Sequence, residues 1–292
     1  MNAGIAVKMA LVIFFTLICD VPDAAVAQSE LTRRETVRAG PATLQVAIRG
    51  KGEPIVFIPS RGRGVEDFDA LSSRLEQAGY QVILPEPRGI GGSTGPLKEI
   101  TYHDLASDVA AVIESLAGHP ATIIGHDFGN RVARTLASDH PRLVKQLVLL
   151  SAGGMVRRSP EMEKLTTRFW ESTLSREDRL AAIRQIFFAA GNKVPRTWEE
   201  GWHFEVARAQ RASDARMALD EWWAGGSAPT LVVQGMEDVV ALPENARRLA
   251  AEFPERVTVV EIPHAGHALL PEQPEQVEKA ILAYLHSRAG TR

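Results

Sequence analysis

The sequence predicts an α/β protein in which a mostly parallel, eight-stranded sheet is flanked by helices and interrupted by one helical insertion. Short apolar runs typical of strands alternate with runs whose apolar residues recur at helical spacing. This alternation favours parallel strands connected by helices that cover both faces of the sheet. Strand candidates stop between about residues 154 and 227 and resume afterwards, which predicts the insertion.

Eight segments are strand candidates. TLQVAIRG, the second, alternates apolar and polar residues and is expected to pair with the first, RETVRAG; the others are short apolar runs typical of strands buried on both faces. In chain order the eight are RETVRAG, TLQVAIRG, PIVFIPS, QVILPEP, PATIIG, VKQLVLLSA, APTLVVQG and VTVVEIP.

Helical patterns lie between and after these strands. In the segment TYHDLASDVAAVIESLAG, Thr101 is the expected N-cap and Gly118 the expected stop. Other helices are expected in EDFDALSSRLEQAGY, ENARRLAAEF and PEQVEKAILAYLHSR, and within the insertion in REDRLAAIRQIFFAA and EEGWHFEVARAQR.

Residues 1–27 have the features of a secretory signal peptide. Lys8 precedes an apolar run from Met9 to Cys19, and Ala25-Val26-Ala27 matches a signal-peptidase site. The run is shorter than the roughly 20 residues that cross a bilayer; an uncleaved anchor is the alternative. We therefore expect an exported protein, periplasmic or secreted, with no stable membrane association after cleavage. Cys19 is the only cysteine, so the mature chain is expected to have no disulfide.

The remaining chain is expected to form a core from residues 28–153 and 228–292, with a helical lid from residues 154–227. All five tryptophans lie in this lid. They either line a ligand site or pack the lid's own small core. The lid residues named as candidates for a substrate pocket are Trp170, Trp202, His203 and Trp222.

The overall charge of the chain argues against a nucleic-acid partner. A formal net charge of −3 gives no basic field for nucleic acid. The histidines lack a spacing typical of metal ligands, so neither a metal nor another cofactor is expected. The expected partners are a small-molecule substrate and water, and the sequence does not predict the oligomeric state.

The stretch IIGHDFGN places Asp127 between Gly125 and Gly129, directly after a strand candidate. It resembles the nucleophile elbow of the α/β-hydrolases, a sharp strand-to-helix turn in which small residues let the helix approach the strand. The resemblance covers about residues 36–285, including the order of the elements. It implies an α/β-hydrolase fold with its active site at the carboxyl end of the sheet.

The resemblance also implies a catalytic triad. In this family an acid and then a histidine follow the nucleophile, and QGMEDVVALP and IPHAGHALLP match the loops after the last two strands. Asp238 is then the acid and His267 the histidine, with Asp127 as the nucleophile. Glu237 and His264 are the respective rivals, and His126 is expected to be structural.

An aspartate at the elbow resembles the epoxide hydrolases and the haloalkane and haloacetate dehalogenases. It implies attack on a saturated carbon to form an alkyl ester, which water activated by the histidine then hydrolyses. This sequence departs from both groups. Its tyrosines, Tyr80, Tyr102 and Tyr284, lie outside the lid, and Phe128 follows the nucleophile where haloalkane dehalogenases usually carry a tryptophan.

A further departure follows the third strand. The family normally has His-Gly there, whereas this chain has Pro59-Ser60, which puts the oxyanion hole in doubt. Backbone N–H groups of Arg61 and Phe128 are the expected donors to the oxyanion or leaving group. The side chains of Arg61 and Arg63 either serve an anion at the pocket mouth or lie on the surface.

The sequence therefore predicts an exported hydrolase that opens an epoxide or cleaves a carbon–halogen bond of a small, largely apolar substrate. The alternative is a non-catalytic or weakly active ligand-binding protein on the same scaffold.

Overall fold

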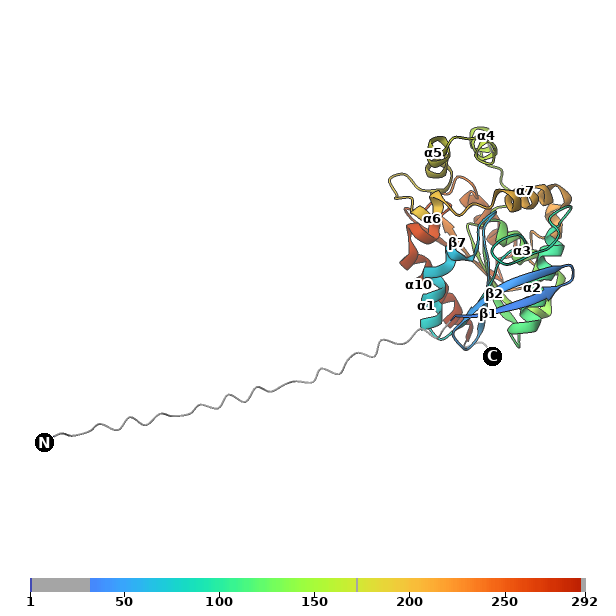
Figure 1. Cartoon of the computed structure of the whole chain (residues 1–292), viewed down its shortest axis with the longest axis vertical. Coiled ribbons are helices and arrows are strands. Elements are labelled where there is room, and N and C mark those ends of the chain that lie inside the picture. The colour runs from blue at the N-terminus through green and yellow to red at the C-terminus, as the bar shows by residue number, and fades with distance from the viewer. Residues whose placement is uncertain (2–31, 172, 290–292) are drawn as a thin grey trace.

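The chain is built around one eight-stranded sheet (Figure 1). The computed structural model describes residue 1, residues 32–171 and residues 173–289. The predicted signal peptide, apart from Met1, lies outside the described residues. The strands are β1 (Arg33–Ala39), β2 (Ala42–Arg49), β3 (Pro54–Ile58), β4 (Gln81–Pro85), β5 (Ala121–His126), β6 (Val144–Leu150), β7 (Thr230–Gly235) and β8 (Val257–Ile262).

The strand order is β1-β2-β4-β3-β5-β6-β7-β8. The β1–β2 and β2–β4 pairs are antiparallel, and all the other neighbours are parallel. The predicted sheet and the predicted pairing of the first two strands are therefore confirmed. Strand β8 differs from the expected buried strand, because it pairs only with β7 at the edge and the residues from Thr258 to Glu261 are partly or fully exposed.

Helices cover both faces of the sheet. Apolar side chains of α2, α3 and α8 belong to the core on one face, and those of α1 and α10 to the core on the other. The helical elements outside the β6–β7 connection are η1 (Val65–Phe68), α1 (Asp69–Gln77), α2 (Tyr102–Leu116), α3 (Phe128–Asp139), η2 (Pro141–Leu143), α8 (Pro243–Glu252), α9 (Leu269–Glu272) and α10 (Pro274–Ala289).

Local chemistry explains where α2 begins and ends. The Thr101 hydroxyl accepts from the N–H of Asp104, whose carboxylate accepts from the N–H of Thr101 in return. This reciprocal capping satisfies donors that the first turn leaves open. Past the other end, Gly118 has φ +74, a left-handed conformation that glycine adopts readily. The predicted cap and stop are confirmed.

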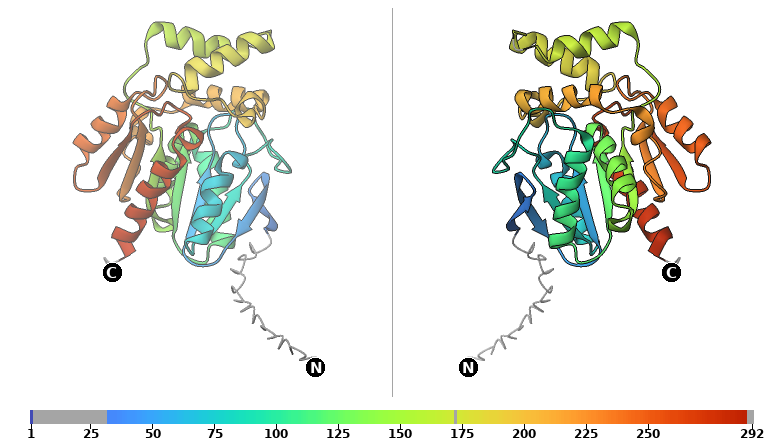
Figure 2. Two further views of the ribbon diagram at one scale, coloured as in Figure 1. Left: turned by 90° about the vertical axis from the view of Figure 1, so that its left-hand side faces the viewer. Right: turned by 90° about the vertical axis from the view of Figure 1, so that its right-hand side faces the viewer.

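The connection between β6 and β7, which we call the β6–β7 segment (residues 151–229), contains no strand among its described residues. Its helices lie over one end of the sheet (Figure 2). They are α4 (Pro160–Phe169), α5 (Arg176–Phe187), α6 (Arg196–Glu199), α7 (Phe204–Ser213), η3 (Asp214–Arg216) and η4 (Leu219–Glu221). The helix expected over EEGWHFEVARAQR is interrupted, since Gly201 has φ +75 and α7 begins only at Phe204.

Candidate active site

Asp127 occupies a tight turn between β5 and α3. Its φ is +48 and its ψ −108, a backbone conformation that residues other than glycine rarely adopt. A Cβ on Gly129 would lie 2.1 Å from the carbonyl oxygen of Ile58, and one on Gly125 would lie 2.6 Å from that of Gly129. The glycines are therefore required by close backbone approach, and the turn lifts Asp127 above the carboxyl end of the sheet.

The two carboxylate oxygens of Asp127 have different neighbours. The Ser60 hydroxyl donates to Oδ2 over 3.0 Å. Nε2 of His267 lies 3.5 Å from Oδ1, a separation of an ion pair rather than of a good hydrogen bond. Burial alone would raise the pKa of Asp127, but the positive charges of His267, Arg61 and Arg131 hold it well below its usual value. Asp127 is therefore ionised at neutral pH.

His267 is fully buried and is held from both sides. Its Nδ1 lies 2.9 Å from Oδ2 of Asp238, while Nε2 faces Asp127 and has no hydrogen-bond partner among the described residues. Burial would lower the pKa of His267, but the carboxylates of Asp238 and Asp127 outweigh it and raise this pKa to about 10. In the resting site His267 is therefore an imidazolium between two carboxylates.

Asp238 is fixed by the loop after β7. Its Oδ1 accepts from the backbone N–H groups of Val240 and Ala241, each over 2.8 Å. Gln234 donates to Oδ2, the oxygen that also contacts His267. These bonds direct Oδ2 of Asp238 toward the imidazole of His267. Asp238 is fully buried and does not line the cavity that opens above Asp127.

The rivals named from the sequence lie elsewhere. Glu237 and His264 are both exposed and lie 3.7 Å from each other. His126 is fully buried, and its Nε2 lies 2.9 Å from the carbonyl oxygen of His267, to which the Ser151 hydroxyl also donates. His126 and Ser151 thus position the backbone of His267, and no hydrogen bond joins either side chain to the Asp127 carboxylate.

The predicted backbone donors border the same turn. Phe128 is the first residue of α3, so its N–H has no partner within the helix. Its ring is buried beneath the guanidinium of Arg61, 5.1 Å from the ring centroid. That the backbone N–H groups of Arg61 and Phe128 form an oxyanion hole stays a prediction. The Ser60 side chain is a donor that the sequence analysis did not identify.

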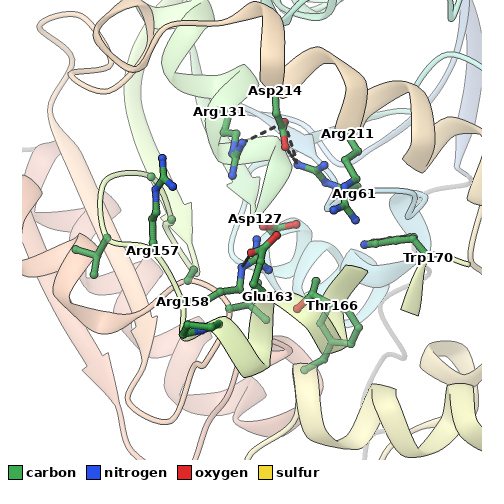
Figure 3. Close-up of a pocket in the computed structure, with 17 residues that line it drawn as sticks. Arg61, Asp127, Arg131, Arg157, Arg158, Glu163, Thr166, Trp170, Arg211 and Asp214 are labelled. Atoms are coloured by element: carbon green, nitrogen blue, oxygen red, sulfur yellow. Dashed lines mark hydrogen bonds and ion pairs between the residues drawn. The ribbon is translucent and has the colours of Figure 1, made fainter. Parts of the chain in front are cut away.

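A cavity of about 490 Å³ opens above Asp127 (Figure 3). Its walls combine apolar and charged residues from β-strand loops, from α3 and from the β6–β7 segment. The lining residues are Arg61, Asp127, Arg131, Gly153, Gly154, Val156, Arg157, Arg158, Pro160, Glu163, Thr166, Trp170, Phe187, Arg211, Asp214, Val240 and Ala241.

Asp214, at the end of α7, ties the β6–β7 segment to the site. Its carboxylate accepts from Arg61 over 2.8 Å and lies 3.1 Å from the guanidinium of Arg131. The Tyr102 hydroxyl donates to Asp214 over 2.7 Å and accepts from Arg131 over 2.9 Å. Tyr102 lies outside the β6–β7 segment and is buried without lining the cavity. Its hydroxyl nevertheless contacts two residues that do line it, Arg131 and Asp214.

Three of the four residues named for the substrate pocket do not line this cavity. Trp170 does, and its indole nitrogen points inward in Figure 3. The indole N–H of Trp202 is bonded to the carbonyl of Trp198. His203 borders a separate surface hollow with Gly89, and Trp222 is buried against Tyr102 and Arg134.

Arg63 is neither at the cavity nor on the surface, contrary to both expectations. It is fully buried between the rings of Trp198 and Trp202. Its guanidinium pairs with Asp67 and donates to the carbonyl oxygens of Thr197 and Glu200. Arg63 therefore anchors the β6–β7 segment to the loop after β3.

Within the described part of the chain, no group of three or more His, Cys, Asp or Glu side chains is arranged to hold a metal ion. No described helix is both long enough and apolar enough to cross a bilayer.

Comparison with known proteins identifies the family. The sequence profile of the alpha/beta hydrolase fold family matches residues 53–274, and the chain belongs to this family. It is 28% identical over 269 residues to the non-heme chloroperoxidase of Streptomyces lividans, with 81% of this chain and 92% of that protein covered. It is 24% identical over 265 residues to the pyrrolizixenacetamide deacetylase of Xenorhabdus hominickii, covering 86% and 97%.

Solved structures agree on the fold. The esterase from Exiguobacterium antarcticum superposes with a TM-score of 0.73 at 21% identity, covering 87% of this chain and 100% of that one. A thermophilic esterase from Thermogutta terrifontis gives 0.70 at 24% identity, covering 87% and 98%. The α/β-hydrolase fold expected from the elbow is therefore confirmed, and the protein is a hydrolase of this fold.

Proposed function

We propose that this α/β-hydrolase uses Asp127 as a nucleophile toward a saturated carbon, opening an epoxide or cleaving a carbon–halogen bond. The observation that carries the proposal is the position of an ionised carboxylate at the elbow, between the Ser60 hydroxyl and the His267 imidazole. A carboxylate needs no deprotonation before it attacks. Asp238 behind His267 completes a nucleophile–histidine–acid arrangement.

In the first step Oδ1 of Asp127 attacks the electrophilic carbon. The new C–O bond forms an alkyl ester, and the bond to halogen or epoxide oxygen breaks with its electron pair on the leaving atom. Oδ1 suits this role because Oδ2 is held by Ser60. The leaving anion develops in a cavity lined by Arg61, Arg131 and the inward-facing indole of Trp170.

In the second step water hydrolyses the ester at Cγ of Asp127. Esterification removes the negative charge of Asp127, one of the two charges that raise the pKa of His267. The imidazolium then gives up its proton more easily, to the opened epoxide oxygen or, after halide departure, to solvent. The neutral Nε2 accepts a proton from the attacking water. The tetrahedral oxyanion forms on Oδ2, within reach of the Ser60 hydroxyl, and collapses by breaking the Cγ–Oδ1 bond. The departing alkoxide takes a proton from the new carboxyl group, which leaves the alcohol product, ionised Asp127 and protonated His267.

A serine-type esterase is disfavoured, although esterases occur among the similar structures. The elbow carries Asp127 rather than serine, and the nearby hydroxyl of Ser60 is directed at Asp127. The ligand-binding alternative is disfavoured because a protein that only binds has no use for a buried imidazolium poised beside an ionised carboxylate.

The test is covalent trapping. His267→Gln in the mature chain removes the base, so a reactive substrate alkylates Asp127 and remains attached. We would incubate this variant with pooled epoxides and haloalkanes and record intact mass. A gain equal to a whole epoxide indicates ring opening, and a gain equal to a halide minus HX indicates carbon–halogen cleavage.

Asp127→Asn combined with His267→Gln is the matched control, and peptide mapping locates the adduct. An adduct that persists in this control assigns the nucleophile elsewhere. No adduct from any compound, with inactive wild type, contradicts the proposal and favours the binding protein.

A further inference from the structure

The cavity above Asp127 is strongly positive although the whole chain carries a formal net charge of −3. Five arginines line it, against three carboxylates. One of the three is Asp127 itself, whose charge disappears when it is esterified in the proposed first step. The local excess of positive charge therefore increases on esterification, until His267 releases its proton. The arginines are Arg61, Arg131, Arg157, Arg158 and Arg211, and the carboxylates are Asp127, Glu163 and Asp214.

Internal ion pairs account for only part of this charge. Asp214 is shared by Arg61 and Arg131, and Glu163 pairs with Arg158 over 2.8 Å. Arg211 donates to the hydroxyl of Thr167, and Arg157 is exposed and has no polar partner among the described residues.

The arginines also act on one another. Burial lowers the pKa of Arg158, and Arg61 and Arg131 lower it further by repulsion, against the attraction of Glu163 and Asp127. Like charges in a partly enclosed site are unfavourable unless an anion compensates them. The side chain of Arg158 is 24% exposed and that of Arg61 is 11% exposed, so water screens this repulsion incompletely.

Apolar side chains form another part of the wall. Phe187, Trp170, Val240 and Ala241 line the cavity beside the charged residues. In Figure 3, Arg157 is drawn to one side of Asp127, and Arg61, Arg211 and Trp170 are drawn to the other. The volume of about 490 Å³ is in the range, roughly 300–1,000 Å³, of pockets that enclose drug-sized molecules.

We infer that the substrate is an elongated organic anion, with a carboxylate held by Arg157 and Arg158 and an electrophilic carbon at Asp127. The apolar body of the substrate lies along Phe187 and the other apolar side chains of the cavity wall. This inference rests on the proposed function and replaces the largely apolar substrate expected from the sequence. Guanidinium groups recognise carboxylates through paired, charge-assisted hydrogen bonds, which makes carboxylate the favoured anion.

The test uses pairs of compounds that differ only in charge. We would measure alkylation of the His267→Gln variant by ω-bromooctanoate and by its primary amide, and by the terminal epoxides of the same two chains. The acid is expected to react about tenfold faster or more, because hydrogen bonds to charged groups are the stronger ones. Equal rates, or a faster amide, would overturn the inference.

Arg157→Gln is expected to reduce the acid-to-amide rate ratio several-fold, and it breaks no polar contact within the described residues. Arg248→Gln is the matched control, because Arg248 is exposed on α8 and does not line the cavity. An unchanged ratio in Arg157→Gln, or an equal loss in both variants, would remove Arg157 from the site.

A binding experiment separates this inference from the proposed chemistry. Octanoate and octanamide are unreactive, so their dissociation constants with the wild-type mature protein can be measured by calorimetry. Tighter octanoate binding without any adduct would reject the alkylation mechanism and keep the anion site. Adducts with equal octanoate and octanamide affinities would keep the mechanism and reject the anion site.

Discussion

The hydroxyl of Ser60 donates a 3.0 Å hydrogen bond to Oδ2 of Asp127. This contact makes the two oxygens of the carboxylate inequivalent, because Oδ1 faces Nε2 of His267. In the proposed reaction, Oδ1 forms the ester and Oδ2 becomes the oxyanion during hydrolysis. Ser60 therefore offers a side-chain donor at the position where the sequence lacks the usual His-Gly pattern.

Removing this donor should slow ester hydrolysis more than ester formation. Loss of one oxyanion donor typically costs about 10²–10³ in rate, so Ser60→Ala should accumulate the alkyl-enzyme during turnover. Rapid quenching followed by intact mass measures its fraction. Ser60→Thr keeps a hydroxyl and is the control. A Ser60→Ala enzyme with wild-type turnover and no accumulated ester would show that backbone donors suffice.

The protonation of His267 should depend on the charge of Asp127. The pKa of His267 is raised to about 10, with Asp238 and Asp127 as the carboxylates that raise it. Asp127→Asn removes one of these charges and should lower the pKa, which ¹⁵N NMR of the imidazole measures. This variant mimics the neutral ester of the intermediate. An unchanged or higher pKa would contradict the proposed switch from imidazolium to base.

The same shift predicts how stability varies with pH. A raised pKa means that the folded state binds the proton more tightly than the unfolded chain. The contribution of His267 is thus fully present below about pH 6.5 and is lost as the pH rises toward 10. The Tm advantage of wild type over His267→Gln should shrink across this interval in thermal denaturation. An advantage that grows with pH would indicate a neutral resting imidazole.

The close approach at the elbow should make Gly129 irreplaceable. A methyl group there would lie 2.1 Å from the Ile58 carbonyl oxygen, and the backbone would have to move. Overpacking of this kind typically costs about 1–3 kcal/mol, measured by urea denaturation of Gly129→Ala. Gly153→Ala is the control, because its methyl group would lie at an ordinary 3.5 Å from Ala241. Equal stability of the two variants would refute the steric argument.

Much of the fold and the arrangement around Asp127 were predictable from local patterns. Period-two and continuous apolar runs indicated the strands, and Thr101 and Gly118 marked the ends of α2. The elbow and the loops after β7 and β8 indicated Asp127, Asp238 and His267, because the ends of parallel strands meet at one edge of the sheet. The structure brings these three side chains together.

The remainder depends on contacts between distant segments. Asp214 reaches Arg61 and Tyr102 across more than a hundred residues, and no local pattern indicates that pairing. The net charge of −3 does not indicate the positive cavity, since its arginines come from the loop after β3, from α3 and from two parts of the β6–β7 segment. The tryptophans of the β6–β7 segment did not indicate which residues line the cavity. Trp202 packs with other aromatic residues of that segment, and Trp222 packs into the core beside the sheet.

Oxygen transfer from the enzyme tests the central role of Asp127 most directly. A single turnover of wild-type protein in excess over substrate would be run in H₂¹⁸O, followed by mass analysis of product and of the peptide containing Asp127. Attack by Asp127 predicts that the product's new oxygen is ¹⁶O and that the peptide gains one ¹⁸O. Direct attack of water on the substrate would instead place ¹⁸O in the product and leave the peptide unlabelled, which would contradict the account.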